Sequence, residues 1–127
     1  MASVSAVIFC DGGVLSFGCW TLVGVTRTVW GEALPFDGSF GLYLLFTDVR
    51  ATVKVEVELH DPVGAAQGET GSLKWRKDFR LQGSAKEQDF ERYFQAESIN
   101  FVRAIDHELH LKVDGKLLQV AILSVVA

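Results

Sequence analysis

The sequence predicts an all-β protein, an immunoglobulin-like β-sandwich of about seven to nine mostly antiparallel strands. The segment Thr52–His60 alternates strictly between apolar and polar residues, which is the period of a strand with one buried face. Near the C-terminus, Asp114-Gly115 separates two apolar segments and is a signal for a type I′ hairpin. Several other short segments, rich in β-branched and aromatic residues, are bounded by turn residues, as is typical of sandwiches.

Composition predicts one domain covering residues 1–127, because 127 residues suffice for a hydrophobic core. The net charge of −4 argues against a nucleic-acid-binding protein, which usually carries a basic excess. No apolar run approaches the roughly 20 residues of a membrane-spanning helix, so no membrane association is expected. The N-terminus lacks the basic region of a signal peptide, which predicts a cytoplasmic protein whose Cys10 and Cys19 are free thiols.

In the first half of the chain, Ser3–Cys10 is predicted to be a strand that ends in a turn at Asp11-Gly12-Gly13. Residues Cys19–Val29 are predicted to form a second strand with a bulge at Gly24. A loop over Gly31–Ser39 follows. The segment Gly41–Thr47 is apolar on both faces, which indicates a central strand.

In the fourth strand, Val53, Val55, Val57 and Leu59 are predicted to be core, and Lys54, Glu56 and Glu58 to be exposed. Asp61-Pro62-Val63-Gly64 then predicts a turn, followed by a Gly-rich loop and a strand over Leu73–Leu81. Ser84 and Glu87 fit a capping box, and Phe90 and Phe94 lie one helical turn apart. This spacing predicts one short helix or helical loop over Ala85–Gln95.

The C-terminal third is predicted to contain a strand over Ile99–Ile105 and then the hairpin formed by Glu108–Val113 and Lys116–Val126. A two-residue turn would place Leu111 opposite Leu118. The last strand is then apolar on both sides: Leu118, Val120 and Ile122 are predicted to face the core, and the opposite row predicts an interface for self-association or for a protein partner. Intramolecular cover is the alternative. The residues of this row are Leu117, Ala121, Leu123 and Val125.

The chain resembles a family of small bacterial β-sandwich proteins without an assigned activity. The resemblance rests on Phe9-Cys10-Asp11, Leu22-Val23-Gly24-Val25, Pro35, a Leu-rich third strand, His60-Asp61-Pro62 and Val113-Asp114-Gly115-Lys116. It implies the sandwich fold and assigns no catalytic or binding residue.

Candidate catalytic and metal-binding residues are few. In Asp106-His107-Glu108-Leu109-His110 the two histidines are three residues apart, so on a strand they point to opposite faces and do not share an ion. His60-Asp61 could orient an imidazole, but the Asp-Pro turn explains the aspartate. Cys10 and Cys19 lack cationic neighbours in the sequence and are predicted to be buried, inert thiols.

Three further patterns offer alternatives. Asp11, Asp37 and Asp61 lie in predicted loops, as calcium ligands of a sandwich rim would. Trp20, Trp30 and Trp75 could line a pocket, although core packing is the usual role of tryptophan. Lys74, Arg76 and Arg80 form a basic stripe, which pairing with Glu56 and Glu58 on a neighbouring strand would explain.

The sequence therefore predicts a non-enzymatic assembly, scaffold or partner-binding module without cofactor or metal. A small-ligand or calcium-binding domain is the first alternative, and an enzyme with a dispersed site is the second.

Overall fold

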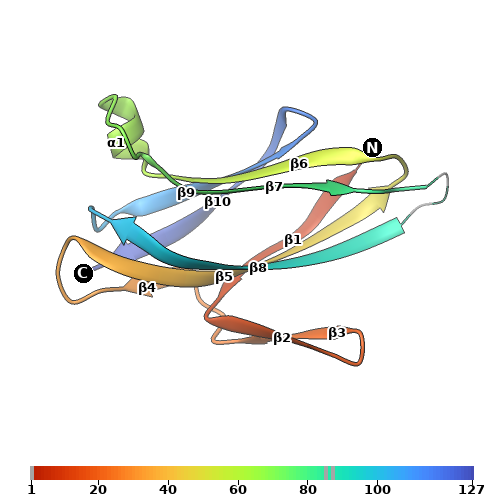
Figure 1. The fold of residues 1–127 in the computed structure, drawn as a ribbon, viewed down its shortest axis with the longest axis horizontal. Coiled ribbons are helices and arrows are strands. Elements are labelled where there is room, and N and C mark those ends of the chain that lie inside the picture. Colours follow the sequence, from red (N-terminus) through yellow and green to blue (C-terminus); the bar gives the residue numbers. More distant parts are fainter. Residues whose placement is uncertain (1, 85, 87) are drawn as a thin grey trace.

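The computed structural model describes residues 2–84, 86 and 88–127 and contains two facing β-sheets and a separate hairpin (Figure 1). The predicted all-β sandwich is confirmed, with ten strands and one helix in the described part of the chain. In chain order the elements are β1 (Ser3–Cys10), β2 (Gly12–Ser16), β3 (Cys19–Val23), β4 (Thr28–Trp30), β5 (Phe36–Val49), β6 (Val53–His60), α1 (Pro62–Ala66), β7 (Leu73–Leu81), β8 (Gln88–Phe101), β9 (Asp106–Val113) and β10 (Lys116–Val126).

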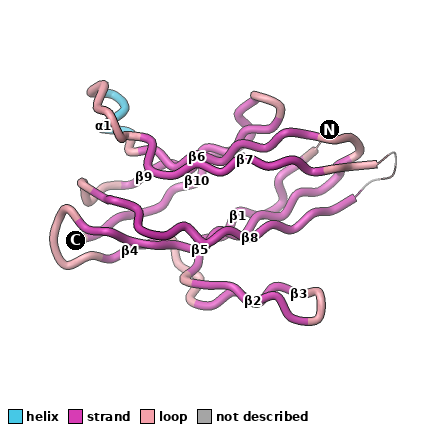
Figure 2. Tube along the Cα trace, in the orientation of Figure 1, coloured by secondary structure: helices cyan, strands magenta, loops and turns pink. Residues whose placement is uncertain are grey.

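The first sheet has the strand order β1-β5-β8, and the second has the order β4-β10-β9-β6-β7. All pairs are antiparallel except β4 with β10, which is parallel. Strands β2 and β3 pair only with each other and extend away from both layers (Figure 2). The chain therefore has a body, formed by the two sheets, and an arm, formed by β2 and β3.

The core lies between the two sheets and is built by alternation along their central strands. Leu42, Leu44 and Phe46 of β5 are fully buried. Opposite them, the predicted inward row of Val53, Val55, Val57 and Leu59 in β6 is confirmed as buried. Burying each large aliphatic or aromatic side chain contributes about 1.5–3 kcal/mol, so these two strands supply much of the stability of the body.

The predicted helix over Ala85–Gln95 is wrong for the residues that the structure describes. Ala85 and Glu87 lie outside them, and β8 begins at Gln88 and pairs with β5. The reason is that residues four apart share a face in a strand as well as in a helix. Phe90 and Phe94 accordingly stand opposite Phe46 and Leu42 of β5. Long-range pairing with β5 overrides the local capping signal.

The one helix of the described chain, α1, occupies the segment predicted as a turn. Asp61 has extended backbone angles and its Oδ1 accepts a hydrogen bond of 2.9 Å from the N–H of Gly64, so it is the N-cap. Pro62 occupies the first helical turn, where its missing N–H is harmless. The same Asp-Pro pair that favours a turn thus also begins a helix.

Several strand boundaries differ from the prediction. Gly12 and Gly13 belong to β2, and the predicted strand Cys19–Val29 is divided into β3 and β4 at Gly24, whose φ is +64°. β5 begins inside the predicted loop, at Phe36, and β8 ends at Phe101, before the predicted end at Ile105. A left-handed glycine ends an extended strand, which explains the division at Gly24.

The predicted type I′ hairpin at Asp114-Gly115 is confirmed, since both residues have positive φ, of 49° and 80°. The first two pairs are those expected, but the register shifts between Leu117 and Gln119. Leu111 therefore stands opposite Gln119, and the predicted pairing with Leu118 is wrong. One extra residue exchanges the two faces of all that follows in β10.

Candidate functional site

The most unusual surface of the molecule is the arm. From Gly12 to Thr26 the sequence contains no charged residue. The arm and the loop that follows it nevertheless project from the body (Figure 1). Their exposed large apolar side chains are Val14, Leu15, Phe17, Val23 and Val25. Exposed apolar surface of this kind is unusual on a folded protein, which makes the arm the candidate interaction surface.

The tip of the arm is a two-residue turn formed by Phe17 and Gly18, which joins the paired residues Ser16 and Cys19. Both turn residues have positive φ, of 51° and 75°, as a type I′ turn requires. The first position favours Asn, Asp or Gly, because other side chains are strained there. Phe17 is both strained and completely exposed, so its ring stabilises nothing in the body.

The arm is held to the body by Tyr93 of β8, which contacts both its base and the Leu15–Trp20 pair next to its last pair of residues. The Trp20 indole stacks on the Tyr93 ring with centroids 4.9 Å apart and planes inclined by 27°. A Cβ atom at Gly13 would lie 2.7 Å from Cε1 of Tyr93, so glycine at this position makes room for the ring. The backbone N–H of Asp11 also donates to the carbonyl oxygens of Val23 and Gly24. These contacts hold the arm from Asp11 to the Leu15–Trp20 pair and leave the turn at Phe17 and Gly18 free.

The row predicted as an interface on β10 is divided by the register shift. Leu123 and Val125 are 1% and 3% exposed and belong to the core, and Ala121 is half-buried against it. Only Leu117 is exposed, at 47%, and it lies before the shift. The prediction of one continuous exposed row is therefore wrong, because the bulge turns Leu123 and Val125 inward.

Two residues of the predicted core face of β10, Val120 and Ile122, lie on its outer surface instead, while Leu118 is half-buried against the core. Val120 and Ile122 are 42% and 40% exposed, and together with Leu117 they form the outer row of β10. The apolar strand face that the sequence indicated therefore exists, but with different residues. The predicted and the observed outward-facing residues of β10 differ only because of the bulge at Leu118.

The rest of the outer face of this sheet is covered by charged side chains. Glu58 of β6 is the centre: its Oε1 accepts from Nζ of Lys112 at 3.0 Å, and its Oε2 lies 3.3 Å from Nη1 of Arg76. Glu58 is only 6% exposed, so its predicted exposure is wrong. Burial alone would raise the pKa of Glu58, but the bonds from Lys112 and His60 together lower it.

The predicted pairing of acidic and basic side chains on β6 and β7 is confirmed. The two strands are antiparallel, with Glu58 opposite Arg76. The guanidinium of Arg76 also lies 3.4 Å from Glu56 and 3.0 Å from Asp78. The basic stripe is thus compensated by carboxylates at its centre, which gives no support to phosphate binding.

The three loop aspartates do not come together. Both oxygens of Asp61 are engaged, one as the N-cap and the other by Nη1 of Arg103 at 2.6 Å. Burial would raise the pKa of Asp61, but the bonds from Gly64 and Arg103 lower it overall. Arg103 also binds Glu69, so this cluster anchors α1 to the loop after β8.

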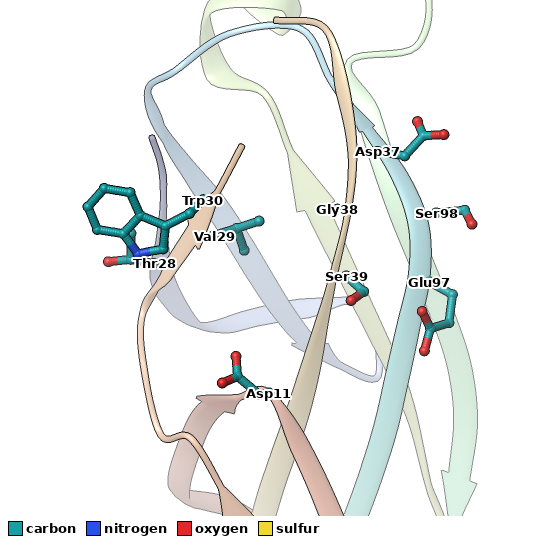
Figure 3. Close-up of a pocket in the computed structure, with 9 residues that line it drawn as sticks. All are labelled: Asp11, Thr28, Val29, Trp30, Asp37, Gly38, Ser39, Glu97 and Ser98. Carbon is teal, nitrogen blue, oxygen red and sulfur yellow. The ribbon is translucent and has the colours of Figure 1, made fainter. Parts of the chain in front are cut away.

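Asp11 and Asp37 line a different hollow, with a volume of about 490 Å³, beside Trp30 (Figure 3). In this view the Trp30 indole and the carboxylates of Asp37 and Glu97 lie on opposite sides of the β5 ribbon. Among the described residues no group of three His, Cys, Asp or Glu side chains is placed to hold a metal ion. The geometry gives the calcium alternative no convergent ligands.

The histidines also separate as the spacing predicted. His107 is buried on the inner face of β9, where its Nδ1 lies 3.1 Å from the Ile105 carbonyl and its ring meets Phe101 edge-on. His110 is on the outer face, 3.0 Å from Glu108 and next to the His60 ring. Burial lowers the pKa of His107, and in the described chain its Nε2 has no hydrogen-bond partner.

The two cysteines are both free, and no disulfide joins them. Cys10 is buried as predicted, and burial raises the pKa of its thiol, which disfavours the reactive thiolate. The predicted burial of Cys19 is wrong, because this residue follows the exposed turn of the arm.

The tryptophans do not form one pocket. Trp20 supports the arm, Trp75 packs edge-on against Phe40 at 5.7 Å in the body, and Trp30 is exposed at the hollow of Figure 3. The sequence patterns did not identify four exposed apolar residues as interface candidates, namely Leu15, Phe17, Val120 and Ile122. The signal that could have found the arm is the uncharged run from Gly12 to Thr26.

Comparison with known proteins shows the fold and no family. No protein-family model and no curated protein matches the chain. A β-glucosidase from Listeria innocua, solved with isofagomine, is similar with a TM-score of 0.53 and 13% identity, over 100% of this chain and 16% of that chain. At this identity the likeness shows a shared fold alone.

Two other solved structures were found at lower TM-scores. An alkylpurine DNA glycosylase from Pseudomonas fluorescens gives 0.47 at 13% identity, over 95% of this chain and 30% of that chain. An immunoglobulin-like protein from Pseudomonas aeruginosa gives 0.48 at 11% identity, over 98% of this chain and 96% of that chain. The chain thus spans less than a third of the length of the glucosidase and the glycosylase.

Proposed function

We propose that the protein is a non-enzymatic interaction module that assembles with a second copy of itself through the β2–β3 arm. The observation that carries this proposal is the tip of the arm, where Phe17 is strained and completely exposed. A residue held in an unfavourable backbone region at no benefit to the body indicates a role outside it.

Burial of the tip in a partner would recover the free energy that the isolated chain loses by exposing it. Covering a phenylalanine or leucine side chain contributes about 1.5–3 kcal/mol, and buried aromatic residues are the usual anchors of protein interfaces. Because Trp20, which pairs with Leu15 near the tip, stacks on Tyr93, the arm is already fixed before binding, which reduces the entropy lost on association.

The partner is inferred to be a second copy because the same chain carries an apolar surface of matching character. The outer row of Leu117, Val120 and Ile122 on β10 is exposed and uncharged, as the arm is. The free thiols of Cys10 and the exposed Cys19 favour a reducing compartment such as the cytoplasm for this assembly. In the described chain no helix is long and apolar enough to cross a membrane.

The proposal is tested by sedimentation velocity over a wide range of protein concentration. The wild type is expected to increase in mass with concentration, and Phe17→Asn to remain monomeric, since asparagine suits the turn and removes the ring. Val63→Asn is the control, because Val63 is an exposed apolar residue on α1, outside the arm. A monomeric wild type at the highest concentration, or association unchanged in Phe17→Asn, would contradict the proposal.

A further inference from the structure

We infer that the arm of one copy adds as a strand to the open edge of β10 in a second copy, an inference that rests on the proposed self-assembly. The arm needs an acceptor that offers both apolar side chains and unpaired backbone groups. The edge of β10 between Gln119 and Leu123 meets both requirements.

The backbone of β10 shows which groups are open. On the edge away from β9, the N–H of Ser124 donates to the Arg27 carbonyl at 2.7 Å and the Val126 carbonyl accepts from Gly31 at 2.9 Å. Hydrogen-bonding groups alternate between the two edges of a strand. The N–H and C=O groups of Val120 and Ile122 therefore point to the same edge, where β4 pairs only with residues from Ser124 to Val126.

The edges of β7 and β8, by contrast, are protected by charge. The side chains of Lys74, Arg76, Asp78 and Arg80 lie along β7, and those of Glu91, Arg92 and Glu97 lie along β8. Charged residues on an edge strand oppose the addition of another strand. From Leu117 to Val126, β10 carries no charge, so its edge lacks this protection.

A groove next to the open edge accommodates a side chain of the incoming strand. It has a volume of about 220 Å³ and lies between β1 and β10. Val7 and Phe9 line its wall on β1, Gln119, Val120, Ala121 and Ile122 line its wall on β10, and Arg27 completes the lining. An apolar residue of the arm, such as Leu15 or Phe17, would contact the apolar part of this lining, formed by Val7, Val120 and Ile122.

The strands of the arm are as long as the open stretch of β10. The open stretch of β10 runs over residues 119–123, between the bulge at Leu118 and the start of the pairing with β4. The strands β2 and β3 are 5 residues each, and each has one unpaired edge. One strand of the arm therefore covers the whole open stretch.

The test uses two full-length variants that each lose one side of the contact. The arm variant is Leu15→Ser with Phe17→Asn, and the edge variant is Val120→Lys with Ile122→Lys. Leu73→Lys is the matched control for the edge variant, because Leu73 is an exposed apolar residue at the opposite edge of the same sheet. Thermal unfolding of each variant confirms that the body is folded before association is measured.

Each variant alone is expected to be monomeric, while Leu73→Lys associates like the wild type. An equimolar mixture, with one variant labelled with ¹⁵N, is expected to give a heterodimer by native mass spectrometry. In this heterodimer the arm of the edge variant meets the intact edge of the arm variant. Its dissociation constant should lie within about tenfold of that of a single wild-type contact.

The other outcomes overturn the inference and separate it from the proposed function. An edge variant that still associates like the wild type means that the arm binds elsewhere, while self-assembly stands. An arm variant that associates while the edge variant does not means that β10 pairs with β10 of the second copy, and the role of the arm falls. Two monomeric variants that do not combine exclude an arm-to-edge contact, and a monomeric wild type overturns both proposals.

Discussion

The β2–β3 and β9–β10 hairpins close with the same backbone turn but fill its first position with residues of different backbone preference. In β9–β10, Asp114 and Gly115 fill the type I′ positions with residues that suit them, and Oδ1 of Asp114 accepts from the N–H of Lys54 at 2.9 Å. In β2–β3, Phe17 takes the position of the aspartate and makes its ring available to solvent. The first turn is therefore filled by residues that suit its backbone, whereas the second carries a strained and fully exposed aromatic side chain.

The largest difference in the free energy of unfolding is expected when a leucine in each hairpin is replaced by alanine. Leu123→Ala in β10 should lower the free energy of unfolding by about 2–5 kcal/mol, because Leu123 is buried between the sheets and its truncation leaves a cavity. Leu15→Ala in the arm should change it by less than about 0.5 kcal/mol. Urea unfolding measures both. Equal effects would show that the Leu15 side chain itself packs on the body in solution.

The two turn glycines provide the next comparison. Gly115→Val should cost about 1–3 kcal/mol of global stability, since a β-branched residue is strained at a φ of 80° and the β9–β10 hairpin is part of the body. Gly18→Val should strain only the arm and leave the global transition almost unchanged. Hydrogen exchange distinguishes the two, with faster exchange confined to β2 and β3 in the second variant. A global loss in Gly18→Val would refute the independence of the arm.

Lowering the pH is expected to destabilise the body of the protein and to leave the stability of the arm unchanged. Burial lowers the pKa of His107 in the folded chain from about 6.5, so the unfolded chain binds more protons as the pH falls below that value. The contribution of His107 is therefore complete above about pH 6.5 and is lost as the pH falls towards its folded pKa. Asp61 and Glu58, whose pKa values are also lowered, lose their contributions only in a second window, below about pH 4.

The measurement is urea unfolding of the wild type and of His107→Leu between pH 7 and pH 5. The wild type should lose stability over this range more steeply than the variant, which retains His60 and His110 as internal controls. Identical pH profiles would show that His107 does not carry the change.

How far the sequence could predict this molecule differs between its regions. The inner face of β6 was predicted correctly, because its alternation coincides with a paired strand whose apolar row faces the core, whereas Glu58 of its outer face is buried by Lys112 and Arg76. For β10 the same rule assigned the wrong face to Leu123, since the extra residue at Leu118 has no local signal and one residue exchanges inside and outside. The helix prediction failed for a related reason, because the four-residue spacing of Phe90 and Phe94 fits both periods.

The candidate site was harder to predict than the fold. An apolar row on the C-terminal strand was recognised, but burial within the chain removed two of its four residues. The arm was interpreted as a turn and part of a strand. Nothing local distinguishes a strand that joins a sheet from one that leaves it, because the difference depends on contacts such as that between Trp20 and Tyr93.

The smallest effect on stability should come from Phe17→Asn, and its sign is the informative part. Asparagine tolerates positive φ better than phenylalanine, and Phe17 makes no buried contact that would be lost, so the free energy of unfolding should stay constant or rise by about 0.5 kcal/mol. Thermal unfolding at low protein concentration, where association does not contribute, measures this change. Because the same variant is expected to lose self-association, it separates folding from assembly in one substitution. If Phe17→Asn instead destabilised the monomer, the ring would be packing on the chain itself and the comparison between the two turns would fail.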